Sequence, residues 1–544
     1  MGSFFCLGIQ SLLEGLDIGG VVGISYADDM SFGSSDLHSL ELVYDTLSSK
    51  LCEVELILRP DKSKLLRRDG DDGEFNVDGV EEVEGLVSCG IPIGPEIFVQ
   101  EFLSGKYQEL VDLLLKILDY RGDFSETSPI LECLSLFRNC IQSKVTHLMR
   151  LLPPGVMVDT FFGDVWELFM DFIRRLLNVE DECDEFEEIW KLPVMMGGGG
   201  LTPVKDIHSY CYLASLSTCI NMYGGSGWDV VEDLNQRLNV NRKLLKNQVV
   251  QSLQKKLCNE WYGKKWETLM KDVPRRVGAR ICGGMGKGAH WLFSNGERGR
   301  TNQKEILFNL ALRFGYHLPF DYQSKFDLHF SDHYEDPSQL LGITNGGGVK
   351  GRHNRLEKLL KKVLIRAGYD VILEPWVGVV NKKRKRADLL VQRGDVLRPI
   401  YIDVTFVSSS MKSYCKRFNS ENLSCAFGSK RNDKLKKYKD EVVKIGGSFL
   451  PIVFDAMGRI DDRAMGPLKT LLAGLGSTGL ASFWRDLAFE LCLMRAWTLR
   501  RLLEGYEAFL DARGIVRVRE RNDERDSELI VESERDDERV VERG

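Results

Sequence analysis

Two pairs of aspartates in this sequence stand where carboxylates could bind divalent cations. Asp28 and Asp29 are adjacent, and they interrupt a short apolar stretch that begins at Val21 and is rich in β-branched residues. Asp388 and Asp403 lie at the ends of two other predicted strands, with 14 residues between them. Oxygen ligands of this kind suit Mg²⁺, which also binds water and substrate phosphates. Both pairs are candidate metal sites, although an ordinary turn or strand end is the commoner explanation of either pair taken alone.

The residues around the first pair predict a β-hairpin followed by a helix. Val21–Tyr26 and Met30–Phe32 have the composition of two short strands, so a hairpin would carry both carboxylates at its tip. Asp36–Leu58 has the apolar spacing of one amphipathic helix, which would end before Arg59-Pro60. Polymerases hold two divalent cations about 3.5–4 Å apart, and adjacent aspartates on a rigid hairpin could supply ligands for them.

Two lysines follow the second aspartate pair on a predicted basic helix. Lys434 and Lys437 are about one turn apart within Lys430–Lys444, so their side chains share a face. Strands near Ala387–Val391 and Pro399–Phe406 could pair and bring the second pair of aspartates to one metal ion. A lysine beside that ion could stabilise the charge of a phosphodiester undergoing cleavage. The spacing does not choose between the two lysines.

Positive charge is concentrated in one block of an acidic chain. The formal net charge is −7, yet Val349–Lys444 contains 24 Lys and Arg against 10 Asp and Glu. A basic block of this size indicates a module that binds a polyanion. Within it lies an unbroken run of five basic residues, Lys382, Lys383, Arg384, Lys385 and Arg386. The run could be a nuclear-localisation signal or a phosphate-contacting loop; its position just before Asp388 favours the second role, and both could hold.

The overall composition indicates an intracellular globular protein with two to four domains. Hydrophobic residues make up 43% and charged residues 28% of the 544 residues. No apolar run is long enough to cross a bilayer, and the first ten residues lack the features of a signal peptide, so no membrane partner is expected. The 13 cysteines are scattered without a C-x-x-C pair, which predicts mostly buried, reduced thiols.

The order of predicted elements changes along the chain. Residues 100–190 are expected to be almost wholly helical, with a break at Pro153-Pro154, and helices continue after Gly197–Gly200 to about residue 320. From Arg352 onward, helices alternate with strands, which is typical of a separate α/β domain. An amphipathic helix at Ala481–Leu503 is expected to pack on that domain.

The first half of the chain resembles reverse transcriptases of non-LTR retrotransposons. The segment FCLGIQSLLEGL followed by VVGISYADDMSFGSS closely resembles their Tyr-x-Asp-Asp region. In LRPDKSKLL, Lys62 matches the lysine of the next family motif, while Arg59 stands where asparagine is usual. Gly90–Gly94 resembles the Gly-x-Pro-x-Gly segment that grips the primer, and the helices up to the glycine run resemble the thumb region. The resemblance implies metal-binding roles for Asp28 and Asp29 and a catalytic role for Lys62.

The resemblance also predicts a missing part. Polymerisation by this family needs an aspartate on an earlier palm strand and a template-positioning segment, both of which would precede Met1. We therefore expect that this chain does not polymerise DNA. Incorporation of dNTPs on a primed RNA template, abolished by Asp28→Ala, would contradict that expectation.

The second half resembles the PD-(D/E)xK restriction-like endonuclease domain of such elements. The resemblance rests on RADLLVQRGDVLRPIYIDVTFVSSS and KLKKYKDEVVKIGGSFLPIVFDAMG, and on the upstream triplet Arg352-His353-Asn354. It implies that Asp388 and Asp403 bind metal, that Lys434 or Lys437 supplies the cation, and that Arg352, His353 and the five-residue basic run contact nucleic acid.

The same domain departs from the family pattern at three places. Ala387 replaces the usual proline, and Thr405 occupies the usual lysine position of the motif, a change expected where the lysine comes from the later helix. Related elements carry a Cys/His zinc knuckle upstream, whereas the corresponding stretch here has His329 and His333 and no cysteine. Two imidazoles without thiolates are a poor zinc site, so no knuckle is expected.

These patterns predict a multidomain α+β fold, with a partial reverse-transcriptase palm and a helical thumb before an α/β PD-(D/E)xK endonuclease-like domain. The expected divisions are 1–98 for the partial palm, 99–190 for the thumb, 191–343 for a helical linker region ending at the degenerate knuckle position, 344–512 for the endonuclease domain, and 513–544 for a charged disordered tail.

The expected function is metal-dependent nicking of DNA for target-primed reverse transcription, with Mg²⁺ or Mn²⁺ as cofactor. DNA and the RNA transcript of the element would be the partners, and the nucleus of a host cell, otherwise the cytoplasm, would be the location. The alternative is a decayed, non-catalytic remnant that binds nucleic acid. Retention of Asp388, Asp403 and the two lysines favours the enzyme, whereas the missing palm and knuckle favour the remnant.

Overall fold

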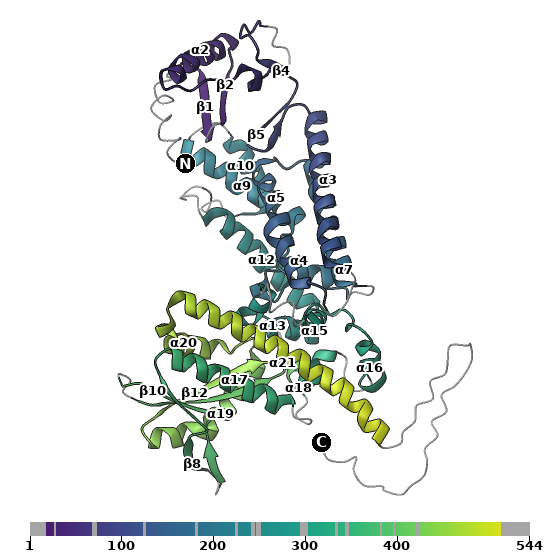
Figure 1. Ribbon diagram of the computed structural model, residues 1–544, viewed down its shortest axis with the longest axis vertical. Coiled ribbons are helices and arrows are strands. Elements are labelled where there is room, and N and C mark those ends of the chain that lie inside the picture. The colour runs from purple at the N-terminus through teal and green to yellow at the C-terminus, as the bar shows by residue number, and fades with distance from the viewer. Residues whose placement is uncertain are drawn as a thin grey trace, which may run out of the picture.

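The computed structural model of the protein describes residues 18–26, 29–67, 73–122, 127–179, 183–223, 227–240, 245, 252–293, 303–331, 336–342, 348–380, 383–394, 398–418 and 424–512. The expected disordered tail, 513–544, lies outside these residues, as do Asp28, Lys382 and His333. Figure 1 shows a mixed α+β architecture, in which a small β-containing part, a helical middle and an α/β part follow one another along the long axis.

The predicted N-terminal hairpin is confirmed. Strands β1 (Val21–Tyr26) and β2 (Asp29–Ser34) pair antiparallel, with Tyr26 opposite Asp29 as the last pair. Helix α2 (Leu37–Glu53) begins after Asp36, whose carboxylate accepts a hydrogen bond from the Ser39 amide at 2.9 Å.

The predicted end of this helix at Leu58 is wrong. Helix α2 ends at Glu53, because Glu55 adopts a φ of +61° and the Leu56 amide turns back to the Leu51 carbonyl at 2.9 Å. A left-handed residue followed by such a six-to-one hydrogen bond closes a helix. Apolar spacing continues past this point in the sequence, and it could not show the local backbone reversal.

Short β-ladders connect the hairpin to the helices. Strands β3 (Lys64–Leu66) and β4 (Glu81–Val83) are parallel, whereas β5 (Leu86–Ser88) and β6 (Ile91–Ile93) form an antiparallel hairpin. Its two turn residues, Cys89 and Gly90, have φ values of +50° and +78°, which are those of a tight primed turn. The Ser31 and Ser88 hydroxyls lie 3.2 Å apart and link the two hairpins.

The middle of the chain is helical, as its periodicity predicts. Its elements are α3 (Glu96–Arg121), α4 (Ile130–Leu136), η2 (Phe137–Ile141), α5 (Gln142–Thr146), α6 (Leu148–Leu151), α7 (Val156–Leu177), α8 (Phe186–Lys191), η3 (Val194–Met196), α9 (Val204–Tyr223), α10 (Trp228–Leu238), α12 (Leu253–Asp272), α13 (Arg275–Gly283), η5 (Gly286–Phe293), α15 (Gln303–Phe314), α16 (Tyr322–His329) and η6 (Pro337–Gly342). The Pro153-Pro154 break separates α6 from α7. One hydrophobic core continues across residue 190, since it contains Trp166, Trp190 and Phe314.

Two arginines, Arg313 buried and Arg138 partly buried, hold the glycine run in this core. Arg313 donates to the carbonyls of Val194, Gly198 and Gly284, at 2.9 Å for the closest contacts. Arg138 donates to Gly199 at 2.6 Å and also to Leu292. Burial lowers the pKa of Arg313 to about 9 and that of Arg138 to about 10, so both stay charged at neutral pH. Backbone dipoles therefore compensate two charges inside the protein.

The α/β part follows the predicted order of elements. It contains α17 (Gly348–Arg366), β7 (Asp370–Leu373), β8 (Trp376–Val380), β9 (Lys383–Arg386), β10 (Leu389–Gln392), β11 (Ile400–Val407), α18 (Lys412–Cys415), α19 (Cys425–Lys444), β12 (Ser448–Asp455), α20 (Asp462–Leu471), η7 (Ala473–Leu475) and α21 (Gly476–Ala512). The main sheet has the order β12-β11-β10-β7, with β11 and β12 parallel and the other pairs antiparallel.

Helices cover both faces of this sheet. Leu360 of α17 and Leu487 of α21 share a core with Ile402, whereas Tyr438 of α19 packs with Tyr401 from the other face. A separate two-stranded ribbon, β8–β9, was not expected. The prediction of a loop for the basic run is wrong at Lys383–Arg386, which forms β9; a run of five basic residues has no apolar alternation that would indicate a strand.

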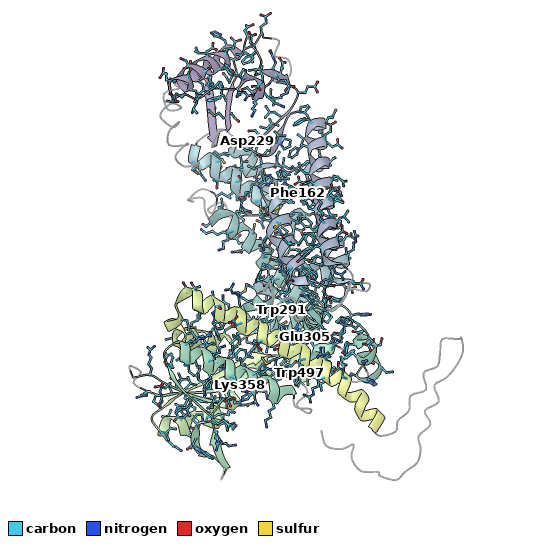
Figure 2. The ribbon with its side chains drawn as sticks, in the orientation of Figure 1. Phe162, Asp229, Trp291, Glu305, Lys358 and Trp497 are labelled. Carbon is cyan, nitrogen blue, oxygen red and sulfur yellow. The ribbon has the colours of Figure 1, made fainter. Side chains whose placement is uncertain are left out.

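Helix α21 joins the α/β part to the helical middle. The prediction that Ala481–Leu503 packs on the α/β part is confirmed, and the helix also crosses the middle beside Trp291 and Glu305 (Figure 2). Arg500 of α21 pairs with Glu305 at 3.2 Å, and Arg495 lies 5.9 Å from the centre of the Trp291 ring. One long helix thus contributes to both cores.

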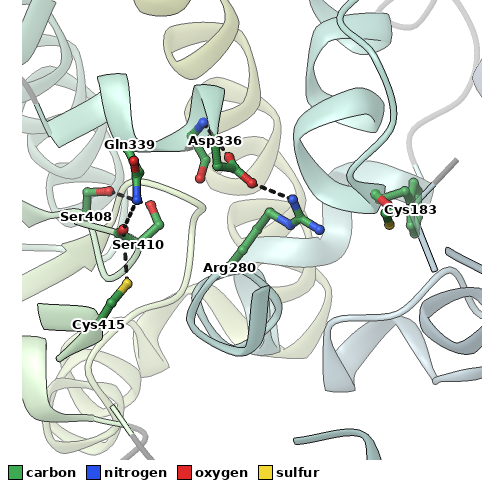
Figure 3. Close-up of polar contacts among 9 residues, drawn as sticks. Cys183, Arg280, Asp336, Gln339, Ser408, Ser410 and Cys415 are labelled. Carbon is green, nitrogen blue, oxygen red and sulfur yellow. Dashed lines mark hydrogen bonds and ion pairs between the residues drawn. The ribbon is translucent and has the colours of Figure 1, made fainter. Parts of the chain in front are cut away.

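A second joint lies between α13, η6 and the loop after β11. Figure 3 shows Arg280 paired with Asp336, at 2.6 Å, and Gln339 donating to the Ser410 carbonyl at 3.1 Å. The Cys415 thiol also donates to Ser410, at 3.1 Å. This joint ties η6 to α13 and to the loop after β11.

Two composition-based expectations can be compared with the structure. None of the helices in the described segments is long and apolar enough to span a bilayer. The twelve described cysteines are all free, and the expectation that most are buried is wrong, because five are buried, three are half-buried and four are exposed. The exposed thiols lie on helix surfaces and turns, which composition alone does not reveal.

Arg313→Met should lower the free energy of unfolding by about 3 kcal/mol, because three buried carbonyls lose a charged donor. Urea denaturation followed by tryptophan fluorescence measures the change. Arg237→Met is the matched control, since Arg237 and its partner Asp233 are 59% and 64% exposed, and exposed pairs contribute little. Equal effects of the two substitutions would show that the buried guanidinium does not stabilise the core.

Candidate metal centre in the α/β part

The two aspartates of the second pair lie opposite one another in the sheet. Leu389 of β10 pairs with Ile402 of β11, so the same register, continued by one residue, places Asp388 opposite Asp403. Asp388 directly precedes β10, as predicted for a strand end, whereas Asp403 lies in the middle of β11. The prediction for Asp403 is wrong because β11 continues four residues beyond it through its parallel pairing with β12.

Three different elements supply contacts to these carboxylates. The Val404 amide of β11 donates to Oδ2 of Asp388 at 2.5 Å, and His353 of α17 lies 3.2 Å from its Oδ1. On the other side, Nζ of Lys434 on α19 lies 2.6 Å from Oδ2 of Asp403. The structure therefore brings the predicted residues Asp388, Asp403, Lys434 and His353 into one cluster.

Burial governs the electrostatics of the cluster. Asp403 is only 2% exposed, and its pKa is raised first by burial and then by the charge of Asp388, while Lys434 lowers it. The hydrogen bond to Asp388 raises the pKa of His353. A carboxylate in such surroundings needs a cation close by to stay ionised.

The geometry separates the two candidate lysines. Lys434 contacts Asp403 directly, whereas Nζ of Lys437 donates to the hydroxyl of Tyr438. Burial, followed by the charge of Lys434, lowers the pKa of Lys437. Burial and the charge of Asp403 raise the pKa of Tyr438, so the phenol stays neutral. Of the two lysines, Lys434 is therefore the one that contacts the paired carboxylates, whereas Lys437 contacts Tyr438.

Glu357 is a nearby residue that the sequence analysis missed. It lies one turn after His353 on α17, and its pKa is raised by burial and then by the charge of Asp388. The signal was present in the sequence, because a histidine and a glutamate four residues apart on a predicted helix share one face. Nothing in the strand pattern, however, indicated that this face would meet Asp388.

The donor set fits a hard cation. Two carboxylates and substrate phosphates are the usual ligands of Mg²⁺, which keeps several waters, and Asp388 and Asp403 provide such a pair. Across the described segments, no cluster of three or more His, Cys, Asp or Glu has the arrangement of a metal site. Two carboxylates fill only part of the coordination shell of Mg²⁺, so the pair suits an ion that also binds water and substrate phosphates.

The remaining residues predicted for this region are dispersed. Arg352 is 2% exposed, donates to the Leu341 carbonyl at 2.7 Å and lies over the Phe406 ring, so it faces the interior. Lys385 is half-buried and Arg386 exposed on β9. The side chains of Lys383 and Arg384 lie outside the described part of the chain.

The first aspartate pair can be placed only by its backbone. Asp29 begins β2, opposite Tyr26, and its side chain, like the whole of Asp28, lies outside the described part. Lys62 ends the short helix η1 (Pro60–Lys62) and is exposed.

Comparison with known proteins gave no relative. Neither the models of protein families nor the curated proteins contain a match to this chain.

Lys434→Met should destabilise the protein by about 3 kcal/mol at pH 8, because it leaves Asp403 charged and buried without its cation. The pKa of Asp403 is raised above 3.8 in the folded protein, so its ionisation costs stability as the pH rises through that raised value. The difference in the free energy of unfolding between variant and wild type should therefore shrink as the pH falls toward 4.

Urea denaturation at a series of pH values measures this difference, with Lys436→Met as the control on an exposed position of the same helix. In an Asp403→Asn background, Lys434→Met should have little effect. A loss of stability that does not vary with pH, or that persists in that background, would contradict the pairing.

Proposed function

We propose that the α/β part is a metal-dependent DNA endonuclease of the restriction-like type, in a chain derived from a non-LTR retrotransposon polyprotein. The observation that carries this proposal is the meeting of Asp388, Asp403 and Lys434 at the centre of the sheet. Two adjacent carboxylates with a lysine are the groups that phosphodiester cleavage requires. The sequence resemblance assigned the same residues, with Lys434 or Lys437 as the lysine.

The roles of the residues follow from their contacts. Asp388 and Asp403 would hold Mg²⁺ or Mn²⁺, and the bound ion would supply an activated water and polarise the phosphate. His353 and the Val404 amide fix the orientation of Asp388, each through one carboxylate oxygen. Lys434 offers an ammonium beside Asp403, where it can stabilise negative charge that develops on the phosphate.

The surrounding charge supports a nucleic-acid substrate. The excess of Lys and Arg over Val349–Lys444 falls on α17, the β8–β9 ribbon and α19, the elements that flank the carboxylates. Phosphate contacts from such a surface orient a duplex without reading its sequence. The basic run before Asp388 suits this role, and as a nuclear-localisation signal it would also take the chain to DNA.

The N-terminal half enters the proposal through its resemblance to reverse transcriptases. The β1–β2 hairpin and the tight turn at Cys89-Gly90 support that resemblance, because each lies where a family motif was assigned. RNA of the element would then be a second partner. The proposed nuclease activity does not depend on this half being a polymerase.

Nicking of supercoiled plasmid by the full chain tests the proposal. With Mg²⁺ or Mn²⁺ the wild type should convert the plasmid to the open circle, and Asp388→Asn and Asp403→Asn should abolish the conversion. Lys434→Met should slow it by about 100-fold or more, the size expected for loss of a charge-stabilising group. Lys436→Met, at an exposed position on α19, should change the rate less than about twofold.

A different outcome would favour the non-catalytic alternative. If wild type and variants are equally inert, while the chain still binds DNA with an affinity that falls steeply with salt, the remnant is a binding protein and the endonuclease proposal fails. Nicking that survives both aspartate substitutions would assign any activity to another site or to a contaminant.

A further inference from the structure

The β8–β9 ribbon carries a half-exposed tryptophan beside an arginine. Trp376 of β8 lies directly opposite Arg386 of β9, and the guanidinium carbon lies 4.3 Å from the centre of the indole ring. The Trp376 side chain is 49% exposed, although its neighbour Val377 is buried against α19. The ribbon thus presents about half of a large aromatic side chain to solvent.

This pair lies next to the candidate metal centre. Arg386 is two residues from Asp388, which at about 3.3 Å per extended residue places their backbones within about 7 Å. The turn between β7 and β8 lies beside residues 386–388. The Glu374 amide donates to the Asp388 carbonyl at 2.9 Å, and the Ala387 amide donates to the Pro375 carbonyl at 3.1 Å. A nucleotide held at the carboxylates would therefore have its neighbour within reach of the ribbon.

The chemistry of the pair favours a flat, electron-rich ligand. Arg386 also pairs with Glu374 at 2.9 Å, which fixes the guanidinium over the ring. An indole supported in this way can stack with any nucleobase, and such stacking tolerates different sequences. Bases inside a duplex hide their faces, so a stacking partner must be unpaired or displaced from the helix.

We propose that Trp376 and Arg386 form a stacking platform for an unpaired nucleobase beside the cleaved phosphate. The preferred substrate of the nuclease is then DNA with a local unpaired or single-stranded nucleotide next to a duplex, rather than a continuous duplex. This inference rests on the proposed function for the position of the phosphate, but the stacking itself can be measured without cleavage.

Binding of fluorescent DNA to the full chain in EDTA tests the platform. The probes are a continuous duplex and the same duplex with one unpaired thymine, and fluorescence anisotropy reports their affinities. Trp376→Ala should weaken binding of the unpaired-base probe by about tenfold, the size of one stacking contact, and binding of the continuous duplex less than about twofold. Trp376→Phe should keep most of the affinity because a ring remains.

Tyr120→Ala is the matched control, because Tyr120 on α3 is 48% exposed and lies far along the chain from the ribbon. It should leave both affinities unchanged. Equal losses on the two probes with Trp376→Ala, or no loss on either, would overturn the inference while leaving nicking untouched. Conversely, selective binding through Trp376 by a chain that never nicks would uphold the platform and reject the endonuclease.

Discussion

Buried guanidinium groups that donate to backbone carbonyls are the interaction on which the rest of this structure depends. Arg313 is buried and Arg138 is partly buried, neither has a carboxylate partner in the described part of the chain, and carbonyls of the glycine run accept their hydrogen bonds. The guanidinium groups can reach those carbonyls because the glycine run packs closely against its neighbours. A Cβ atom added to Gly199 would lie 2.0 Å from a ring atom of Trp190. A larger side chain would push the loop away and leave the charges unsolvated.

The same interaction positions the elements of the candidate metal centre. Arg495 of α21 donates to the Met457 carbonyl just after β12, which ties the long helix to the strand paired with β11. Arg352 donates to the Leu341 carbonyl and so anchors the first turn of α17, the helix that carries His353 beside Asp388. Arg352 was predicted to contact nucleic acid, but in the structure it is buried and helps to orient the site.

The sequence predicted the elements whose signal is local. Alternating or periodic apolar residues located the hairpin strands, the strands of the main sheet and α19, and the spacing of Asp388 and Asp403 placed them opposite each other. The features that the sequence did not predict depend on tertiary contacts. The choice of Lys434 over Lys437 follows from how α19 sits on the sheet, and the β8–β9 ribbon forms from a basic run without strand-like alternation.

The electrostatics of Asp403 bear on the proposal that a metal ion binds at this cluster. Asp403 is 2% exposed and faces a second aspartate, so burial and the charge of Asp388 raise its pKa. Lys434 compensates part of the charge of Asp403, whereas the cationic group in contact with Asp388 is the partly exposed imidazole of His353. Glu357 also lies near Asp388, so three carboxylates share the positive charge of Lys434, Lys437 and His353. Under the proposed function, a divalent ion held by Asp388 and Asp403 would offset the negative charge that remains at this cluster when the imidazole of His353 is neutral.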